Sequence, residues 1–170
     1  MTETKTFNRH TACAFTGRRP QSLPWGYDET GPGARGFAAC LQNEINKAYA
    51  DGYRTFLCGM AQGIDLMACE LTIQLQLSDI KIIAALPGKN QTRSWPFNAV
   101  KRYENCLSHC HDIYYAAELC SSESYHRRNR WMVDNASRLI AVWEGNPTGG
   151  AGRTAQYAAK QGVEVVRLWP

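Results

Sequence analysis

Short apolar runs alternate with longer amphipathic segments along the whole chain. In the longer segments the apolar residues recur every three or four positions, the period of an α-helix with one buried face. Strands are predicted at residues 11–16, 54–58, 81–86, 112–116, 139–143 and 163–168, and helices at 34–50, 65–77, 96–108, 123–136 and 151–161. Several of the strands are continuously apolar, as parallel strands buried on both faces are. The alternation predicts an α/β fold, a three-layer sandwich with a mostly parallel sheet of about six strands.

Length and composition fit one domain. The chain has 170 residues, of which 44% are hydrophobic, and this is enough for a single core. We expect an N-terminal tail at residues 1–10 and a single domain over residues 11–170. The net charge of +4 is too small to require a nucleic acid or a membrane surface as partner. No apolar run approaches the ~20 residues of a membrane-spanning helix, and no secretory signal is recognisable, so we expect a cytoplasmic protein without a membrane partner.

The seven cysteines are an odd number, and most lie inside apolar stretches. They are predicted to be small buried thiols in a reducing compartment. Zinc-ligand chemistry is concentrated at Cys106, His109, Cys110, His111 and Cys120, but no pair there has the usual C-x₂-C spacing. A helix end with incidental Cys and His residues is the favoured interpretation, and no metal site is predicted.

Polar chemistry is concentrated in the connections that lead from strands to helices. These connections, at residues 17–33, 59–64, 87–95 and 144–150, are long and rich in Gly, Arg and Gln, whereas the helix-to-strand links are short. In an open parallel sheet, ligands bind at the carboxyl ends of the strands, where the strand-to-helix loops gather. We therefore expect the binding site at this edge, with the first loop, 17–33, as a structured lid.

Two glycine turns in these loops could bind phosphate. Gly59 and Gly63 precede the second helix, and Gly149 and Gly150 precede the last one. Glycine lets the backbone approach a ligand closely, and a helix N-terminus offers unpaired N–H groups. Neither turn is a Walker A loop or a G-x-G-x-x-G fingerprint, and a flexible loop is the alternative for the second turn. Two such turns at one edge favour a phosphorylated ligand.

Charged side chains accompany the turns. Asp65 could cap its helix or accept the hydroxyl groups of a ribose, and both roles can hold at once. Guanidinium groups bind phosphate bidentately, although a solvated helix face is the commoner reason for a basic run. The basic residues are Arg18 and Arg19 after the first strand, and His126, Arg127, Arg128 and Arg130 on the fourth helix. Only one helix face can look into the crevice, and we predict that Arg128 lies on it. Whether the run from 126 to 130 binds nucleic acid stays open.

Gln91 and Trp95 follow the third strand. Trp95 could stack on a base, and partly buried packing is the more common alternative for a tryptophan. Gln91 could read a polar edge of the ligand.

These motifs together resemble the SLOG superfamily, and within it the YpsA/YoqJ-like branch. The resemblance rests on residues 16–20, 59–65, 87–95, 128–130 and 149–150, and it covers the chain from residue 11 to about 168. It implies a Rossmann-like sheet that binds a nucleotide or a nucleotide-derived ligand, and a homodimer is an open possibility. The candidate binding residues are Gly17, Arg18, Arg19, Gly59, Gln62, Gly63, Asp65, Gln91, Trp95, Arg128, Asn129, Gly149, Gly150 and Thr154. No resident cofactor is predicted apart from this ligand.

Two related families favour different functions. Residues 59–65 and 128–130 are similar to the DprA proteins, which bind single-stranded DNA. Arg128 and Asn129, followed by the glycine turn at 149–152, are similar to the Lonely-guy phosphoribohydrolases. In that family a catalytic Glu occupies the position of Gln156, and Arg153 stands where the pattern has Thr. An amide cannot serve as a carboxylate base or stabilise an oxocarbenium charge in the same way. The catalytic candidates that remain are Arg128, Asp65 and Glu144.

Three functions follow, in this order of preference. The first is a sensor or regulatory module for a nucleotide-derived ligand, which needs no catalytic carboxylate. The second is an enzyme resembling a nucleoside-monophosphate phosphoribohydrolase, and the third is DprA-like binding of single-stranded nucleic acid. All three depend on one geometric expectation. The glycine turns that begin at Gly59 and Gly149 must converge, with the Arg128 side chain, around one anion pocket.

Overall fold

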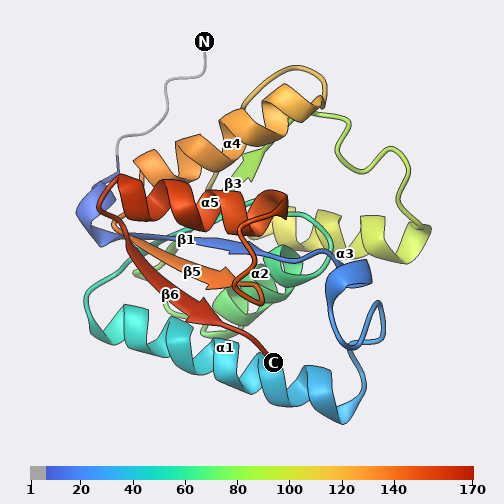
Figure 1. Cartoon of the computed structure of the whole chain (residues 1–170), viewed down its shortest axis with the longest axis horizontal. Helices are drawn as coiled ribbons and strands as arrows, with labels where there is room; N and C mark the ends of the chain where they lie inside the picture. The colour runs from blue at the N-terminus through green and yellow to red at the C-terminus, as the bar shows by residue number, and fades with distance from the viewer. Residues whose placement is uncertain (1–6) are drawn as a thin grey trace.

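The computed structural model describes residues 7–170 and follows the predicted alternation of strands and helices (Figure 1). The strands are β1 (Ala12–Gly17), β2 (Thr55–Cys58), β3 (Lys81–Leu86), β4 (Asp112–Tyr115), β5 (Arg138–Val142) and β6 (Glu164–Leu168). The helices are α1 (Pro32–Ala50), α2 (Ile64–Gln74), α3 (Phe97–Ser108), α4 (Ser122–Asp134) and α5 (Gly149–Lys160), with short 3₁₀ helices at Arg9–Thr11 and Pro20–Ser22. Every pairing in the six-stranded sheet is parallel, so the predicted Rossmann-like α/β sandwich is confirmed.

Two helical layers cover the sheet (Figure 1). The helices α1, α2 and α3 bury large residues against one face, where Phe15 stacks on Phe56 with 5.9 Å between ring centroids. The helices α4 and α5 cover the other face, whose core is rich in alanine. Because successive strand residues point to opposite faces, β1 supplies Phe15 to the first layer and Ala14 to the second. Small residues on the second face let α4 and α5 approach the sheet closely.

The strand order β4-β3-β2-β1-β5-β6 reverses direction beside β1. After β1 the chain builds outward to β4, and α4 then carries it across the opposite face to β5. The loops after β1 and β5 therefore leave the sheet in opposite directions, and their ends are side by side because Gly17 pairs in register with Val142. This switch point is where open parallel sheets leave a crevice for ligands.

Element boundaries differ from the predicted ones by at most three residues, and the strand predicted at 81–86 has the predicted bounds. The helix predicted at 65–77 ends at Gln74, because Gln76 adopts a left-handed backbone with φ of 52° that cannot continue an α-helix. The helix predicted at 151–161 begins two residues earlier, at Gly149. The loop predicted as a lid contains a 3₁₀ turn and buries Leu23, and its Trp25 packs on Phe37 at 5.4 Å between ring centroids.

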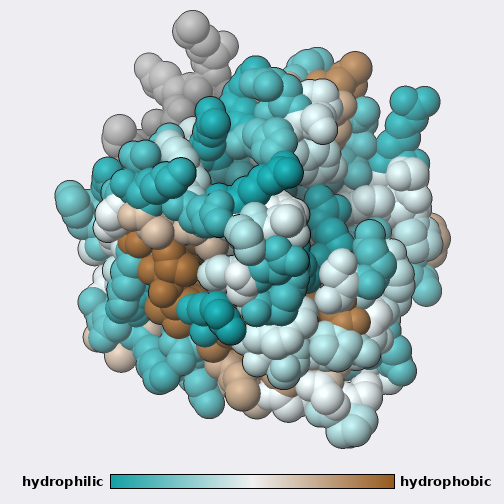
Figure 2. Space-filling view, viewed as in Figure 1, coloured by the Kyte–Doolittle hydropathy of each residue, from teal (hydrophilic) through white to brown (hydrophobic). Residues whose placement is uncertain are grey.

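The tail predicted at residues 1–10 is only partly inside the described range, since residues 1–6 lie outside it. Phe7 packs edge-on against Trp131, with 6.2 Å between ring centroids, and Arg9 donates a hydrogen bond to the Ala136 carbonyl. Figure 2 shows a face that is mostly hydrophilic, and its largest hydrophobic patch lies beside β6. Within residues 7–170, no helix combines the length and the apolar character that crossing a membrane requires.

The suggested zinc ligands are used for other contacts. His111 accepts a hydrogen bond from the Ile82 N–H through Nδ1, at 3.1 Å, and Nδ1 of His109 lies 2.8 Å from the Asn105 carbonyl. Cys106 is buried in the core, and all seven cysteines are free. No group of three or more His, Cys, Asp or Glu side chains in the described part of the chain is arranged to hold a metal ion.

Candidate functional site

A cavity of about 230 Å³ lies at the carboxyl end of β1, at the switch point of the sheet. We call it the switch-point pocket. It is lined by Thr16 and Gly17 of β1, Arg19 of the following loop, Asp65 of α2, Ser122, Tyr125, His126, Arg128, Asn129 and Met132 of α4, and Gly150 and Ala151 of α5. Residues from both helical layers therefore line the same pocket, at the carboxyl edge where open parallel sheets bind ligands.

Arg128 forms one wall of the pocket and is only 3% exposed. Its Nη1 donates hydrogen bonds to the carbonyl oxygens of Gly59 and Ala85, the second at 3.2 Å, and its Nε donates to Oδ1 of Asn129 at 2.7 Å. These three bonds fix the guanidinium plane, while Nη2 donates to no described residue. A buried guanidinium with a spare donor suits an anionic partner. Burial lowers the pKa of Arg128, and the nearby Asp65 carboxylate partly opposes that shift.

Arg19 brings a second guanidinium to the same pocket. The Cζ atoms of Arg19 and Arg128 lie 5.5 and 5.6 Å from the centroid of the Tyr125 ring. The positive charge of Arg19 contributes to the lowered pKa of Arg128, as expected for two like charges that face each other. Neither arginine forms an ion pair within 4.0 Å inside the described range. A bound anion would relieve this repulsion.

The N-terminus of α5 completes the positive side of the pocket. Its N-cap residue, Thr148, makes no side-chain capping bond, and the first turn holds no acidic residue. The backbone N–H groups of Gly150 and Ala151 donate no hydrogen bond to any acceptor in residues 7–170, and both residues line the pocket. Around Gly150 the space that a Cβ would take is open. Unpaired N–H groups and the helix dipole together favour an anion here.

Asp65 is the single carboxylate among the residues that line the pocket. It is 6% exposed, and its Oδ2 accepts a hydrogen bond from the Ala61 N–H at 3.3 Å. The N-cap of α2 is Gly63, so Asp65 holds the preceding loop and does not cap the helix. Burial raises the pKa of Asp65, and the charges of Arg128 and Arg19 partly offset this effect.

The turn that begins at Gly59 serves as a support for these side chains. The Gly59 carbonyl accepts hydrogen bonds from Arg128 and from Nε2 of Gln91, the second at 3.1 Å. A Cβ at this position would collide with the Arg128 guanidinium and lie 2.7 Å from Oδ2 of Asp65. Gly63, with φ of 92°, is covered by the backbone of Arg18 and Pro20, so the N-terminus of α2 is closed to a ligand.

Several predicted site residues lie outside the pocket. Arg18 is occupied by Glu144 and by the Thr148 carbonyl, and Gly149 lies beside its guanidinium with φ of 79°. Trp95 packs edge-to-face on Tyr103, with 5.6 Å between ring centroids. Gln91 is buried and Gln62 is half-buried, and neither lines the switch-point pocket. Thr154 is also buried, and its hydroxyl donates to the Gly150 carbonyl at 2.7 Å. The structure therefore brings Arg128, Asp65, Arg19, Gly17, Asn129 and Gly150 together.

Sequence reasoning missed Tyr125, Ser122 and Ala151. A signal for Tyr125 exists, since it precedes Arg128 by three residues and so shares its helix face. The capping box of Ser121 and Ser124 starts α4 and orients this face toward the crevice.

A model of the family described as the YspA SLOG family, YpsA, matches residues 13–167. The chain belongs to the YspA SLOG family. The match begins in β1 and ends in β6, so it includes the pocket and the whole sheet. The SLOG resemblance predicted from the motifs, including its YpsA-like branch, is confirmed.

Two relatives of this SLOG protein are the UPF0398 proteins of Bacillus thuringiensis strain Al Hakam and Bacillus cereus strain AH187. Each is 23% identical over 153 residues, which cover 88% of this chain and 83% of the relative. Among solved structures, DNA processing protein A (DprA) from Streptococcus pneumoniae is similar, with a TM-score of 0.64 and 20% identity. The likeness covers 93% of this chain and 50% of the DprA chain, so the SLOG protein spans half of that relative. It establishes the shared fold.

Proposed function

We propose that this SLOG protein is a binding module for a nucleotide or a nucleotide-derived ligand, whose phosphate occupies the switch-point pocket. The observation that carries the proposal is the pair Arg19 and Arg128, which face the same cavity without a carboxylate partner within 4.0 Å. The unpaired N–H groups of Gly150 and Ala151 point to the same ligand chemistry. Phosphate matches guanidinium groups in shape and in charge.

A sensor or regulatory role is preferred because the pocket is poor in catalytic carboxylates. Gln156 replaces the Glu of the hydrolase pattern, is exposed on α5 and does not line the switch-point pocket. Glu144 lies outside the pocket and is held by Arg18, whose hydrogen bonds lower the pKa of this carboxylate and so make it a weaker base. Binding needs none of these groups, whereas hydrolysis does.

The proposal is tested with purified protein and a panel of nucleoside 5′-monophosphates, with the matching nucleosides as controls. A ligand at 100 times its dissociation constant adds about 2.7 kcal/mol to the free energy of unfolding, so a thermal shift will detect it. Titration calorimetry then gives the dissociation constant. We expect Arg19→Ala to weaken binding about tenfold, because one partly exposed charge-assisted contact is lost. Arg128→Lys should weaken binding as well, because it keeps the charge and loses the fixed fork of donors.

Arg35→Ala is the matched control for these variants. Arg35 is exposed on α1 and does not line the switch-point pocket, so this substitution removes a positive charge outside the site. Binding that responds equally to all three substitutions, or to none of them, contradicts the proposed pocket.

An enzyme of the phosphoribohydrolase class is the second candidate, and Asp65 is the observation that favours it. This carboxylate lies in the pocket, and burial raises its pKa, which suits a general acid or base. Release of free base from a nucleoside monophosphate, measured by chromatography and lost in Asp65→Asn, would establish the activity.

Binding of single-stranded nucleic acid is a third candidate, suggested by the similarity to a DNA-processing protein. Such binding should weaken steeply with salt, because each phosphate contact releases counterions. A single small-ligand pocket gives a much shallower salt dependence.

A further inference from the structure

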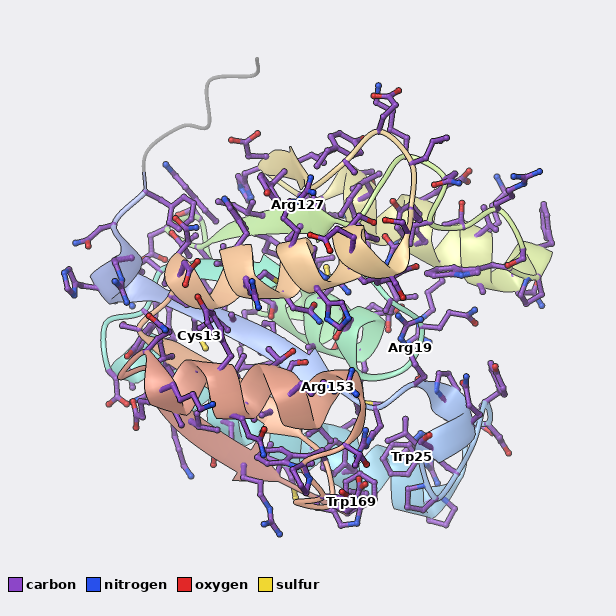
Figure 3. All side chains as sticks on the ribbon, turned by 45° about the horizontal axis from the view of Figure 1, so that its top comes forward. Cys13, Arg19, Trp25, Arg127, Arg153 and Trp169 are labelled. Atoms are coloured by element: carbon purple, nitrogen blue, oxygen red, sulfur yellow. The ribbon has the colours of Figure 1, made fainter. Side chains whose placement is uncertain are left out.

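A second, larger cavity of about 660 Å³ lies between α4 and α5, next to the switch-point pocket. We call it the α4–α5 groove. Figure 3 shows Arg153 near the first turn of α5, in the space between the two helices, and Arg19 near the same end of the sheet. The groove and the pocket share His126, Asn129 and Gly150 as lining residues. A ligand seated in the pocket can therefore extend into the groove without leaving the protein surface.

The groove carries positive charge that the protein does not neutralise. Arg130 and Arg153 both line it, and neither forms an ion pair within 4.0 Å inside residues 7–170. Arg130 lies over the Tyr157 ring, 5.7 Å from the centroid, which holds the guanidinium in place at the groove wall. Arg153 has no hydrogen bond or aromatic contact with any described residue and is exposed.

The two acidic residues that line the groove each have a partner among the other groove residues. Glu123 pairs with Arg127 at 3.8 Å, and Arg127 also donates a hydrogen bond to the Ala116 carbonyl at 2.9 Å. Oδ1 of Asp134 accepts a hydrogen bond from the Tyr157 hydroxyl at 2.8 Å. Arg130 and Arg153 are left as donors for an anion, beside the imidazole of His126.

We propose that the α4–α5 groove is a second anion subsite, so that the ligand carries two phosphoryl groups, one in each cavity. The inference rests on the proposed function, because it assumes that the first phosphate occupies the switch-point pocket. The pocket of about 230 Å³ is smaller than common small-molecule sites of ~300–1,000 Å³, so a whole nucleotide needs room beyond it. Arg153 also stands where the hydrolase pattern has Thr, which places a guanidinium in this groove.

The decisive measurement compares 5′-monophosphates with 3′,5′-bisphosphates of the same nucleosides by titration calorimetry. We expect the bisphosphate to bind the wild-type protein about tenfold more tightly, the size of one good charge-assisted contact at an exposed site. In the double variant Arg130→Gln and Arg153→Gln this advantage should fall to less than about twofold, with the affinity for the monophosphate unchanged.

The double variant Arg35→Gln and Arg93→Gln is the matched control. Both residues are exposed and line neither cavity, so the protein loses the same net charge without losing a groove donor. It should keep the full advantage of the bisphosphate. An equal loss in both double variants would mean that only the overall charge matters, and this would overturn the subsite.

Failure of this inference is distinguishable from failure of the proposed function. If the monophosphate binds and Arg128→Lys weakens it, but the bisphosphate gains nothing, only the second subsite is wrong. If neither ligand binds, both proposals are wrong. A short single-stranded oligonucleotide is tested in parallel, and tighter binding of the oligonucleotide than of every bisphosphate would overturn the assignment to a small ligand.

Discussion

Arg18 and Glu144 join the two loops that leave the sheet on either side of its switch point. Nε of Arg18 donates to one carboxylate oxygen of Glu144 at 2.8 Å, and Nη2 donates to the other. Nη1 of Arg18 adds a hydrogen bond to the Thr148 carbonyl at 3.2 Å, directly before α5. This pair holds the loop after β5 against the loop after β1, and so places the first turn of α5 at the edge of the switch-point pocket.

The pair should make stability depend on pH in the acid range. Hydrogen bonds from Arg18 lower the pKa of Glu144 below its ordinary value of 4.5. A lowered pKa means that the contribution to stability is present above pH 4.5 and is lost as the pH falls through the folded-state value. Urea unfolding at pH 3 to 7 measures the free energy of unfolding of the wild type and of Glu144→Gln. The difference between the two proteins should shrink as the pH falls. The effect should be small, because the pair is exposed to solvent.

Gly59→Ala should displace the Arg128 side chain and so distort the switch-point pocket. A Cβ at this position collides with the guanidinium of Arg128, and overpacking of this kind costs about 1–3 kcal/mol of the free energy of unfolding. Ligand binding should be lost with it, because Arg128 must move. Denaturant unfolding and calorimetry check both effects.

Gly36→Ala is the control for that variant, because Gly36 lies in α1 with open space around it. There the substitution should raise the free energy of unfolding by about 0.5–1 kcal/mol through helix propensity, with binding unchanged. If Gly59→Ala also keeps its stability and binding, Arg128 is not held as the structure indicates.

The fold was predictable because its signals are local. A run such as residues 81–86, which is apolar throughout after Lys81, occurs where a strand is buried on both faces, and the structure has a strand with the same bounds. The ends of helices were less predictable. The left-handed backbone of Gln76 prevents α2 from continuing, and glutamine is not a residue type that predicts this conformation.

The site was predictable as a location and less so as a set of contacts. The loop positions placed Arg128, Asp65 and Gly150 at one edge, and the structure has them around one cavity. Sequence could not show that Arg18 is bound by Glu144, or that the backbone of residues 18–20 covers the N-terminus of α2. Both contacts join residues that are distant in the chain, and a local sequence pattern cannot predict such contacts.

The cysteines should separate into groups by their reaction with a thiol reagent. Cys40 is exposed on α1, whereas Cys13, Cys58 and Cys69 are fully buried in the core. Burial raises the pKa of the Cys13 thiol, which keeps it protonated and unreactive at neutral pH. We expect the fast reaction of Cys40 to be absent in Cys40→Ser, a slower reaction of the half-buried Cys110 and Cys120, and release of the buried thiols only on unfolding. Fast reaction of several core thiols would contradict this packing.

Asp65 should give a pH dependence of opposite sign to that of Glu144. Burial raises the pKa of Asp65 above its ordinary value of 3.8, so the folded state keeps this proton to a higher pH than the unfolded chain does. Its contribution to stability is therefore present below pH 3.8 and is lost as the pH rises through the raised value. Asp65→Asn has no such titration, and its stability relative to the wild type should rise with pH. A difference that stays constant from pH 3 to 8 would contradict the burial of this carboxylate.

Asp65→Asn also separates a binding module from a hydrolase. In a binding module the carboxylate opposes the charge of a bound phosphate, so its replacement by an uncharged amide should tighten the binding of a nucleoside monophosphate. In a hydrolase the carboxylate takes part in the reaction, so the same variant should lose base release while it still binds the nucleotide. Calorimetry and chromatography on the same protein sample measure the two quantities. Tighter binding without base release in either protein supports the module, and base release by the wild type alone supports the enzyme.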